Sequence, residues 1–198
     1  MKVIEIVRSS WDKIGSIYDS YRDKHKIDNE LEEIVKLLPA KAKVLDVGSG
    51  SGEPVAKFLV EKGIKVTGID ISEKMVELAQ KNVPQATFIQ MDMFALNFEE
   101  NSFDGIICVY SLWHVPKKEH TQIYKAFHRI LKPKGLLVIN TGIRESEGMS
   151  DFFGEPMLWS NYDPKTTLKL VKEAGFTIDF EGILERGGEY QYWIFARK

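Results

Sequence analysis

Acidic residues and glycines gather where the first apolar run of the chain ends, in VLDVGSGSGEP at residues 44–54. Asp46 precedes three glycines, which in such a turn let a ligand lie against bare backbone at a helix N-terminus. A second acid, Asp70, ends the next apolar run in GIDIS. A carboxylate at that point can accept both hydroxyl protons of a ribose. These residues indicate a nucleoside ligand, although Asp70 could instead cap a helix and the glycines could serve the turn alone.

The spacing argues against phosphate groups in this turn. A dinucleotide fingerprint needs a small residue at the sixth position from Gly48, where Glu53 stands, and no Lys-Ser/Thr pair follows the glycines. Asp46 would repel a pyrophosphate but suits an ammonium group. Asp92 lies between two methionines in MDM, where it could accept a hydrogen bond from an exocyclic amine beside an apolar purine site, or act as a turn residue. The ligand so described is an adenosine that carries an amino acid.

Strand and helix patterns alternate from residue 31 to residue 142, which predicts an α/β fold with a parallel sheet and crossover helices. After them, two strands joined at Gly187-Gly188 predict an antiparallel hairpin at the end of the chain. The expected strands before that hairpin are 43–47, 65–69, 87–90, 105–109 and 136–140. The expected helices are 54–62, 73–81, 119–131 and 163–174, and the less regular connection 92–102 is also assigned as a helix.

Length and composition limit the function classes. A chain of 198 residues with 43% hydrophobic content fits one domain, residues 1–198. The net charge is −2 and the 27 basic residues are scattered, so a nucleic-acid partner is not indicated. No signal peptide or membrane-spanning run is recognised, which predicts a cytoplasmic protein without membrane contact. The single cysteine, Cys108 in GIICVY, is expected to be a buried, inert thiol, and no metal site is expected.

Five segments, in order, resemble the motifs of the class I S-adenosylmethionine-dependent methyltransferases: VLDVGSGSG, GIDIS, the MDM acid, FDGIICVYSLWHV and LKPKGLLVI. The resemblance covers nearly the whole chain and implies a Rossmann-like, doubly wound sheet of seven strands with S-adenosylmethionine as the cofactor. It implies glycines under the methionyl part, Asp70 on the ribose, Ile71 and Met93 beside the adenine, and the backbone after Tyr110 near the sulfonium. The predicted cofactor-binding residues are Asp46, Gly48, Ser49, Gly50, Asp70, Ile71, Met75, Asp92, Met93 and Tyr110.

Methyl transfer is an in-line displacement that depends mainly on the alignment of donor and acceptor. An acceptor hydroxyl or ammonium must also lose a proton, and His114, just past the fourth strand, is the candidate catalytic base; a packing histidine is the alternative. The segment YSLW lacks the Asn/Asp-Pro-Pro-aromatic tetrad that enzymes methylating nucleic-acid amino groups usually have. Methylation at cytosine C5 would need a cysteine nucleophile nearby, but Cys108 is mid-strand. Neither class of nucleic-acid methylation is therefore favoured. We expect methylation at O or N of a small, partly apolar molecule. An RNA-modifying enzyme and a non-catalytic cofactor-binding regulator are the alternatives.

Two aromatic segments could form the acceptor pocket. Trp11, Ile14, Tyr18 and Tyr21 share one face of an N-terminal helix, so residues 1–30 are expected to form a helical lid, or else an ordinary docking face. Residues 143–163 have no clear period but are rich in aromatics, and we expect a substrate-covering insertion or a dimer interface there. The chain would accordingly be a monomer or a homodimer. The predicted substrate-binding residues are Tyr18, Tyr21, Trp113, His114, Phe153, Trp159 and Tyr162.

Overall fold

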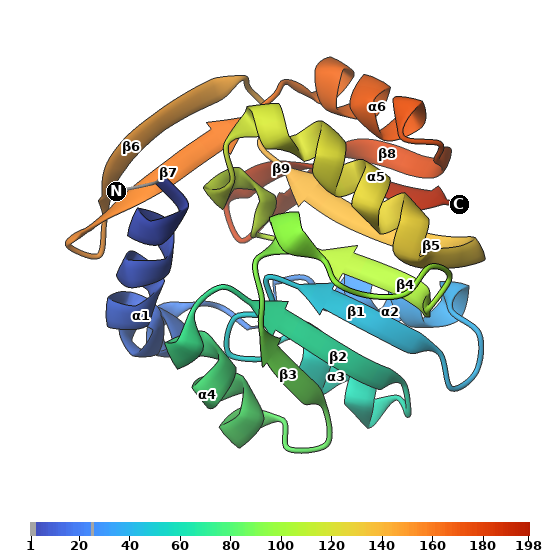
Figure 1. The fold of residues 1–198 in the computed structure, drawn as a ribbon, viewed down its shortest axis with the longest axis horizontal. Coiled ribbons are helices and arrows are strands. Elements are labelled where there is room, and N and C mark those ends of the chain that lie inside the picture. Colours follow the sequence, from blue (N-terminus) through green and yellow to red (C-terminus); the bar gives the residue numbers. More distant parts are fainter. Residues whose placement is uncertain (1–2, 25) are drawn as a thin grey trace.

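The structure is a computed structural model that describes residues 3–24 and 26–198. Its main sheet has seven strands in the order β3-β2-β1-β4-β5-β9-β8 (Figure 1). The strands are β1 (Lys43–Val47), β2 (Lys65–Asp70), β3 (Thr87–Gln90), β4 (Phe103–Cys108), β5 (Leu131–Thr141), β8 (Thr177–Arg186) and β9 (Glu189–Arg197). The pairs from β3 to β5 are parallel, whereas β9 runs antiparallel to both β5 and β8. The expected doubly wound α/β sheet with a terminal hairpin is confirmed.

Helices cover both faces of this sheet because each presents an apolar stripe to it. Residues of α2 (Asp28–Leu37), α3 (Val55–Glu61) and α4 (Glu73–Asn82) join one apolar core with one face of the strands. Residues of α5 (His120–Ile130) and α6 (Pro164–Glu173) join the second core with the other face. Cys108 is fully buried in this second core, as expected. The sheet is therefore fixed from both sides, which holds the carboxyl ends of the parallel strands in place.

A further helix, α1 (Val3–Tyr21), lies beside those carboxyl ends rather than on a face of the sheet (Figure 1). It packs against α4 and against a separate two-stranded hairpin. Val7 and Ile14 of α1 are buried with Met157 and Leu158 of that hairpin in a third apolar cluster. Residues 1, 2 and 25 of the expected lid 1–30 lie outside the described residues. The described part of that range contains α1 and the start of α2.

The segment after β5 differs from what the sequence indicated. It forms an antiparallel hairpin of β6 (Ser146–Phe152) and β7 (Glu155–Asn161), which makes a sheet of its own. The turn between the strands has positive φ angles at Phe153 (55°) and Gly154 (85°), as a two-residue hairpin turn requires. The helix expected over 92–102 is wrong, because only a 3₁₀ turn at Met93–Ala95 is present. Among the described residues, no helix combines the length and apolar character needed to cross a membrane.

Candidate functional site

The glycine turn after β1 brings the ends of β1 and β2 together. The backbone N–H groups of Gly48 and Ser49 both donate to the carbonyl oxygen of Ile69, at 2.8 and 2.9 Å. Gly48 and Gly50 have φ angles of +70° and +54°, which side chains rarely tolerate. A Cβ on Gly48 would lie 2.4 Å from Cβ of Ser111, whereas one on Gly50 would meet only Nη1 of Arg22, at 3.8 Å. Gly48 thus admits the loop after β4, and Gly50 leaves space at the cavity.

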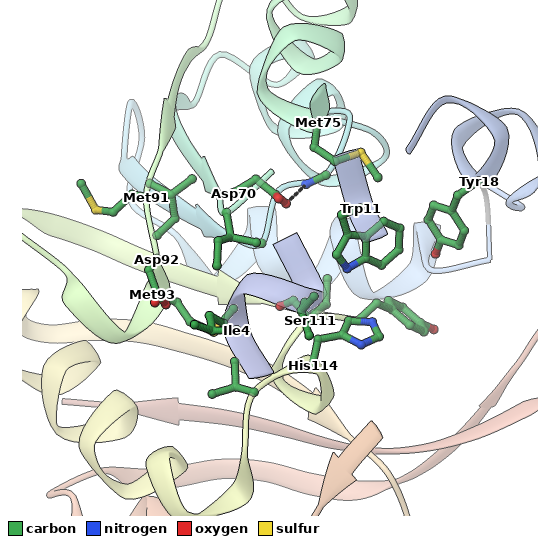
Figure 2. A pocket seen from close by; sticks show the side chains of 18 of the residues that line it. Ile4, Trp11, Tyr18, Asp70, Met75, Met91, Asp92, Met93, Ser111 and His114 are labelled. Carbon is green, nitrogen blue, oxygen red and sulfur yellow. Dashed lines mark hydrogen bonds between the residues drawn. The ribbon is translucent and has the colours of Figure 1, made fainter. Parts of the chain in front are cut away.

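Asp70 is buried at the end of β2 and faces the cavity (Figure 2). Its Oδ2 accepts a hydrogen bond from the N–H of Gly50 and its Oδ1 accepts one from the N–H of Ser72, each at 2.9 Å. Burial raises the pKa of Asp70 to about 6, although these hydrogen bonds oppose the shift. Helix α4 is capped by the Ser72 side chain, which accepts from the N–H of Met75, so Asp70 is not needed as its cap. Each oxygen of Asp70 has a second lone pair that can accept from a ligand hydroxyl.

Asp46 is more deeply buried, with an exposed fraction of 2%. Its Oδ2 has no hydrogen-bond partner in the described part of the chain, and neither has Oγ of the neighbouring Ser49. Burial raises the pKa of Asp46 to about 7, against the attraction of the Arg22 guanidinium. Both residues line a second cavity that adjoins the first at Gly48. Asp46 thus brings an unpartnered carboxylate oxygen to the lining of a cavity, which fits the ammonium group expected at the amino-acid end of S-adenosylmethionine.

The other end of the first cavity is lined by apolar side chains and one acid (Figure 2). Asp92 caps the 3₁₀ turn, because its Oδ1 accepts from the N–H of Phe94 at 2.9 Å, and it also lines the cavity. The two interpretations of Asp92 are therefore compatible. Met91, Asp92 and Met93 lie together at this end, whereas Met75 lies beside Trp11 of α1 farther along the cavity (Figure 2). Ile71 also lines this cavity.

Arg22 is a site residue that the sequence reasoning missed. Its side chain lines all three cavities at this edge of the sheet. Its Nη2 donates to Oγ of Ser51 at 3.3 Å, and its Nε lies 3.5 Å from a carboxylate oxygen of Asp19. A guanidinium in this position offers several donors to a ligand carboxylate. The available signal was a basic residue one turn after Tyr18 on the same predicted helix, but the pattern that marked this helix was its face of Trp11, Ile14, Tyr18 and Tyr21.

A third cavity of about 500 Å³ opens beside the first two cavities, which contain the predicted cofactor-binding residues and are called the cofactor cavities below. Tyr18, Arg22 and Tyr110 line it as well as the other two, so the three spaces adjoin one another. We call this third cavity the acceptor cleft. Its size is in the range that proteins use for small-molecule ligands. Five of the predicted substrate-binding residues line it: Tyr18, Trp113, His114, Phe153 and Trp159.

The structure does not bring the other two predicted substrate-binding residues into the acceptor cleft. Tyr21 is 78% exposed at the end of α1, and its ring lies beside that of the hairpin residue Phe153, with centroids 5.8 Å apart. The ring of Tyr162 lies beside His120, with centroids 6.0 Å apart, and 5.4 Å from Nζ of Lys117. Helical periodicity placed Tyr21 on the correct face, but α1 ends there and leaves its ring in solvent. Tyr162 comes after the last residue of β7.

His114 lines the cleft but both of its ring nitrogens are engaged. Its Nδ1 lies 2.9 Å from the carbonyl oxygen of Leu158, and the indole Nε1 of Trp113 donates to its Nε2 at 3.1 Å. A carbonyl accepts, so Nδ1 carries the proton and the lone pair of Nε2 is used by Trp113. Burial lowers the pKa of His114 to about 4. Its role as a base stays a prediction, and this geometry favours a neutral, positioning histidine.

The comparisons with known proteins agree with this geometry. Residues 44–135 match a family model described as a methyltransferase domain. One relative is the Bacillus subtilis protein YqeM, which is named as a methyltransferase. It is 29% identical to this chain, and the match covers 83% of this chain and 71% of YqeM. The uncharacterized methyltransferase sll0829 of Synechocystis is 30% identical over 69% of this chain and 67% of its own length.

Solved structures have the same fold. A structure of S-adenosylmethionine-dependent methyltransferases from Methanosarcina mazei covers 84% of this chain and 96% of its own, with a TM-score of 0.76 and 26% identity. The N1-methyltransferase of didemethyltoxoflavin from Burkholderia thailandensis, solved with S-adenosylhomocysteine, covers 98% of this chain and 88% of its own, with a TM-score of 0.80 and 22% identity. This chain belongs to the class I S-adenosylmethionine-dependent methyltransferases and is an enzyme that uses S-adenosylmethionine as its cofactor.

Proposed function

We propose that this enzyme transfers a methyl group to an oxygen or nitrogen atom of a small, partly apolar molecule. The observation that carries the proposal is the acceptor cleft, which adjoins the cofactor cavities at Tyr18, Arg22 and Tyr110. A small molecule held there would lie beside the loop after β4, where the resemblance to the family places the sulfonium. Bound S-adenosylmethionine supplies an electrophilic methyl group.

The chain's own residues bind and orient the two reactants. Asp46 and Arg22 would hold the ammonium and carboxylate of the amino-acid end, and Asp70 would accept from the ribose hydroxyls. On the acceptor side, α1 and the β6–β7 hairpin cover the cleft, with Trp11 and Tyr18 from the helix and Phe152 and Trp159 from the hairpin among its lining. We propose that they act as the lid and the substrate-covering insertion that the sequence led us to expect for residues 1–30 and 143–163. Together they would exclude water and align the acceptor, which supplies most of the rate enhancement in such a displacement.

The relatives include enzymes named for small-molecule acceptors. One is the demethylmenaquinone methyltransferase of Thermotoga maritima, which is 30% identical and of which this chain covers 59%. Another is named for 27-O-demethylrifamycin SV in Amycolatopsis mediterranei, at 33% identity over 42% of its length. The chain spans only part of these proteins, so their names support the class of acceptor rather than any one compound.

A screen for acceptor-dependent formation of S-adenosylhomocysteine tests the proposal. Purified protein is incubated with S-adenosylmethionine and a panel of phenols, amines, quinones and unmodified RNA. Turnover on a small molecule that yields an O-methyl or N-methyl product supports the proposal. Turnover on RNA alone contradicts it, and so does tight cofactor binding without turnover on any acceptor, which would indicate a regulator.

A further inference from the structure

The acceptor cleft has an aromatic wall contributed by three separate parts of the chain. Six rings follow one another in contact along it, and neighbouring centroids are 5.1 to 6.3 Å apart. Four of these five contacts are edge-on and one is tilted, so the rings form a cage rather than a stack. In order, the rings are those of Tyr18, Trp11, Phe152, Trp159, Trp113 and Tyr110, and we call them the aromatic wall.

A polar strip runs along the cleft beside one end of the aromatic wall. The hydroxyl of Tyr110 donates to Oε1 of Gln191 at 2.9 Å, and Nε2 of Gln191 donates to a carboxylate oxygen of Glu189 at 3.0 Å. Nζ of Lys26 donates to the same Glu189 oxygen at 2.7 Å and lies 4.3 Å from the centroid of the Tyr110 ring. Polar atoms are thus offered to a ligand from one edge, through groups that the chain has already oriented.

The charges in this cleft balance. Its lining contains two basic residues, Arg22 and Lys26, and two acidic ones, Asp23 and Glu189. Lys26 and Glu189 form an ion pair with each other. A charged acceptor would lose hydration against the aromatic wall without gaining an excess of opposite charge in return, which is costly. For a cation, attraction to the ring faces offsets only part of this cost. A neutral ligand avoids that cost.

We infer that the methyl acceptor is an uncharged, flat aromatic molecule whose hydroxyl or amino group lies against the Tyr110–Gln191 strip. This inference rests on the proposed function and narrows its substrate class. Aromatic rings gain about 0.5–1.5 kcal/mol from each edge-on or offset contact beyond their burial, a factor of about 2 to 13 in affinity. The aromatic wall would therefore select such a molecule over a saturated one of similar size.

Binding to protein saturated with S-adenosylhomocysteine tests the inference without the need for turnover. Calorimetry would compare naphthol with decahydronaphthol, hydroxynaphthoic acid and naphthyltrimethylammonium. We expect naphthol to bind at least about 5-fold more tightly than each of the others. Equal or weaker binding of naphthol, including the absence of measurable binding, overturns the inference.

Variants of the wall provide the second measurement. Trp159→Leu and Phe152→Leu should each weaken naphthol binding by about 2- to 10-fold and change decahydronaphthol binding less. Phe180→Leu, an exposed aromatic on β8 that does not line the cleft, is the matched control. Melting temperatures would show that each variant is folded. An unchanged preference for naphthol in both wall variants contradicts the inference.

Naphthol, decahydronaphthol, hydroxynaphthoic acid and unmodified RNA, assayed for S-adenosylhomocysteine formation, separate this inference from the proposed function. Turnover of decahydronaphthol or hydroxynaphthoic acid in preference to naphthol would overturn the uncharged aromatic class and leave small-molecule methylation intact. Turnover of RNA alone would overturn both.

Discussion

The indole Nε1 of Trp113 donates a hydrogen bond of 3.1 Å to Nε2 of His114, the next residue in the chain. The other nitrogen of His114 bonds the carbonyl oxygen of Leu158 in β7. His114 therefore connects the loop after β4 to the hairpin that covers the acceptor cleft. A base in that position must first lose the bond from Trp113, so we interpret His114 as a positioning residue.

A neutral His114 predicts a specific dependence of stability on pH. Its pKa falls from the ordinary 6.5 to about 4 in the folded protein. Between these values the unfolded chain binds a proton that the folded chain does not, so stability decreases as pH falls. We expect the free energy of unfolding to drop by about 2 kcal/mol more in the wild type than in His114→Gln between pH 7 and pH 5. Urea unfolding at both pH values measures this.

The same substitution tests the role in activity. If His114 positions the hairpin, His114→Gln should raise KM for the acceptor while the kcat of both proteins shows no titration near pH 6.5. A kcat that falls by a factor of about 100 or more, together with loss of an acidic limb present in the wild type, would instead identify His114 as the base.

Asp70 should contribute to cofactor affinity through its free lone pairs. Asp70→Ala is expected to weaken S-adenosylhomocysteine binding by about 1–3 kcal/mol, the usual value for hydrogen bonds to a buried charged group. Asp179→Ala, which removes an acid paired with Arg197 on the last two strands, is the control. Calorimetry with unaltered affinity in Asp70→Ala would refute the assignment to the ribose.

If Asp46 faces the ammonium group of the cofactor, cofactor binding should depend on pH. Burial raises its pKa from 3.8 to about 7. An ammonium ligand binds the ionised carboxylate, so affinity should fall as pH drops from 8 to 6 and protons occupy Asp46. Asp46→Asn should bind more weakly at pH 8 and show a flatter pH dependence. Equal wild-type affinities at pH 8 and pH 6 would show that Asp46 does not face the ammonium.

The buried carboxyl group of Asp46 should also lower the stability of the ligand-free protein. Because its folded pKa lies above the unfolded value, stability is lost as pH rises from about 4 to 7 and the buried carboxyl ionises. At pH 8, Asp46→Asn without cofactor should be more stable than the wild type by about 1–3 kcal/mol. Thermal or urea unfolding of the ligand-free proteins checks this, and a less stable variant would contradict it.

The cofactor half of the site was predictable because short, local signals determine it. Apolar runs that end in Asp46 and Asp70 place these acids at the carboxyl ends of neighbouring parallel strands, whatever the rest of the chain does. The cavity that Asp70 lines also contains Asp92, which its sequence context proposed, and Ile71, which the resemblance to the family proposed. Arg22 was missed because its proximity depends on the packing of α1 against α4, a contact between distant segments.

The β6–β7 hairpin could not be recognised from its pattern. Every residue of β6 up to Asp151 is exposed, so no alternation of apolar and polar residues marks it. In β7 the buried residues come in consecutive pairs, Met157 with Leu158 and Ser160 with Asn161, rather than at alternate positions. The reason is that β7 packs against both α1 and the loop after β4. The turn residues are Phe153 and Gly154, whereas Asn-Gly or Asp-Gly is the usual signal. Tertiary contacts, rather than local propensity, specify this hairpin.

The two glycines of the turn should separate stability from binding. Gly48→Ala adds a Cβ at a positive φ and 2.4 Å from Cβ of Ser111, so we expect it to lower the free energy of unfolding by about 2–5 kcal/mol. Gly50→Ala has the same backbone strain but no clash, so about 1–2 kcal/mol is expected. Its added methyl group enters space beside Arg22 and should reduce S-adenosylhomocysteine affinity. Unfolding curves and calorimetry on both variants measure these effects, and equal losses of stability would show that Ser111 moves aside freely.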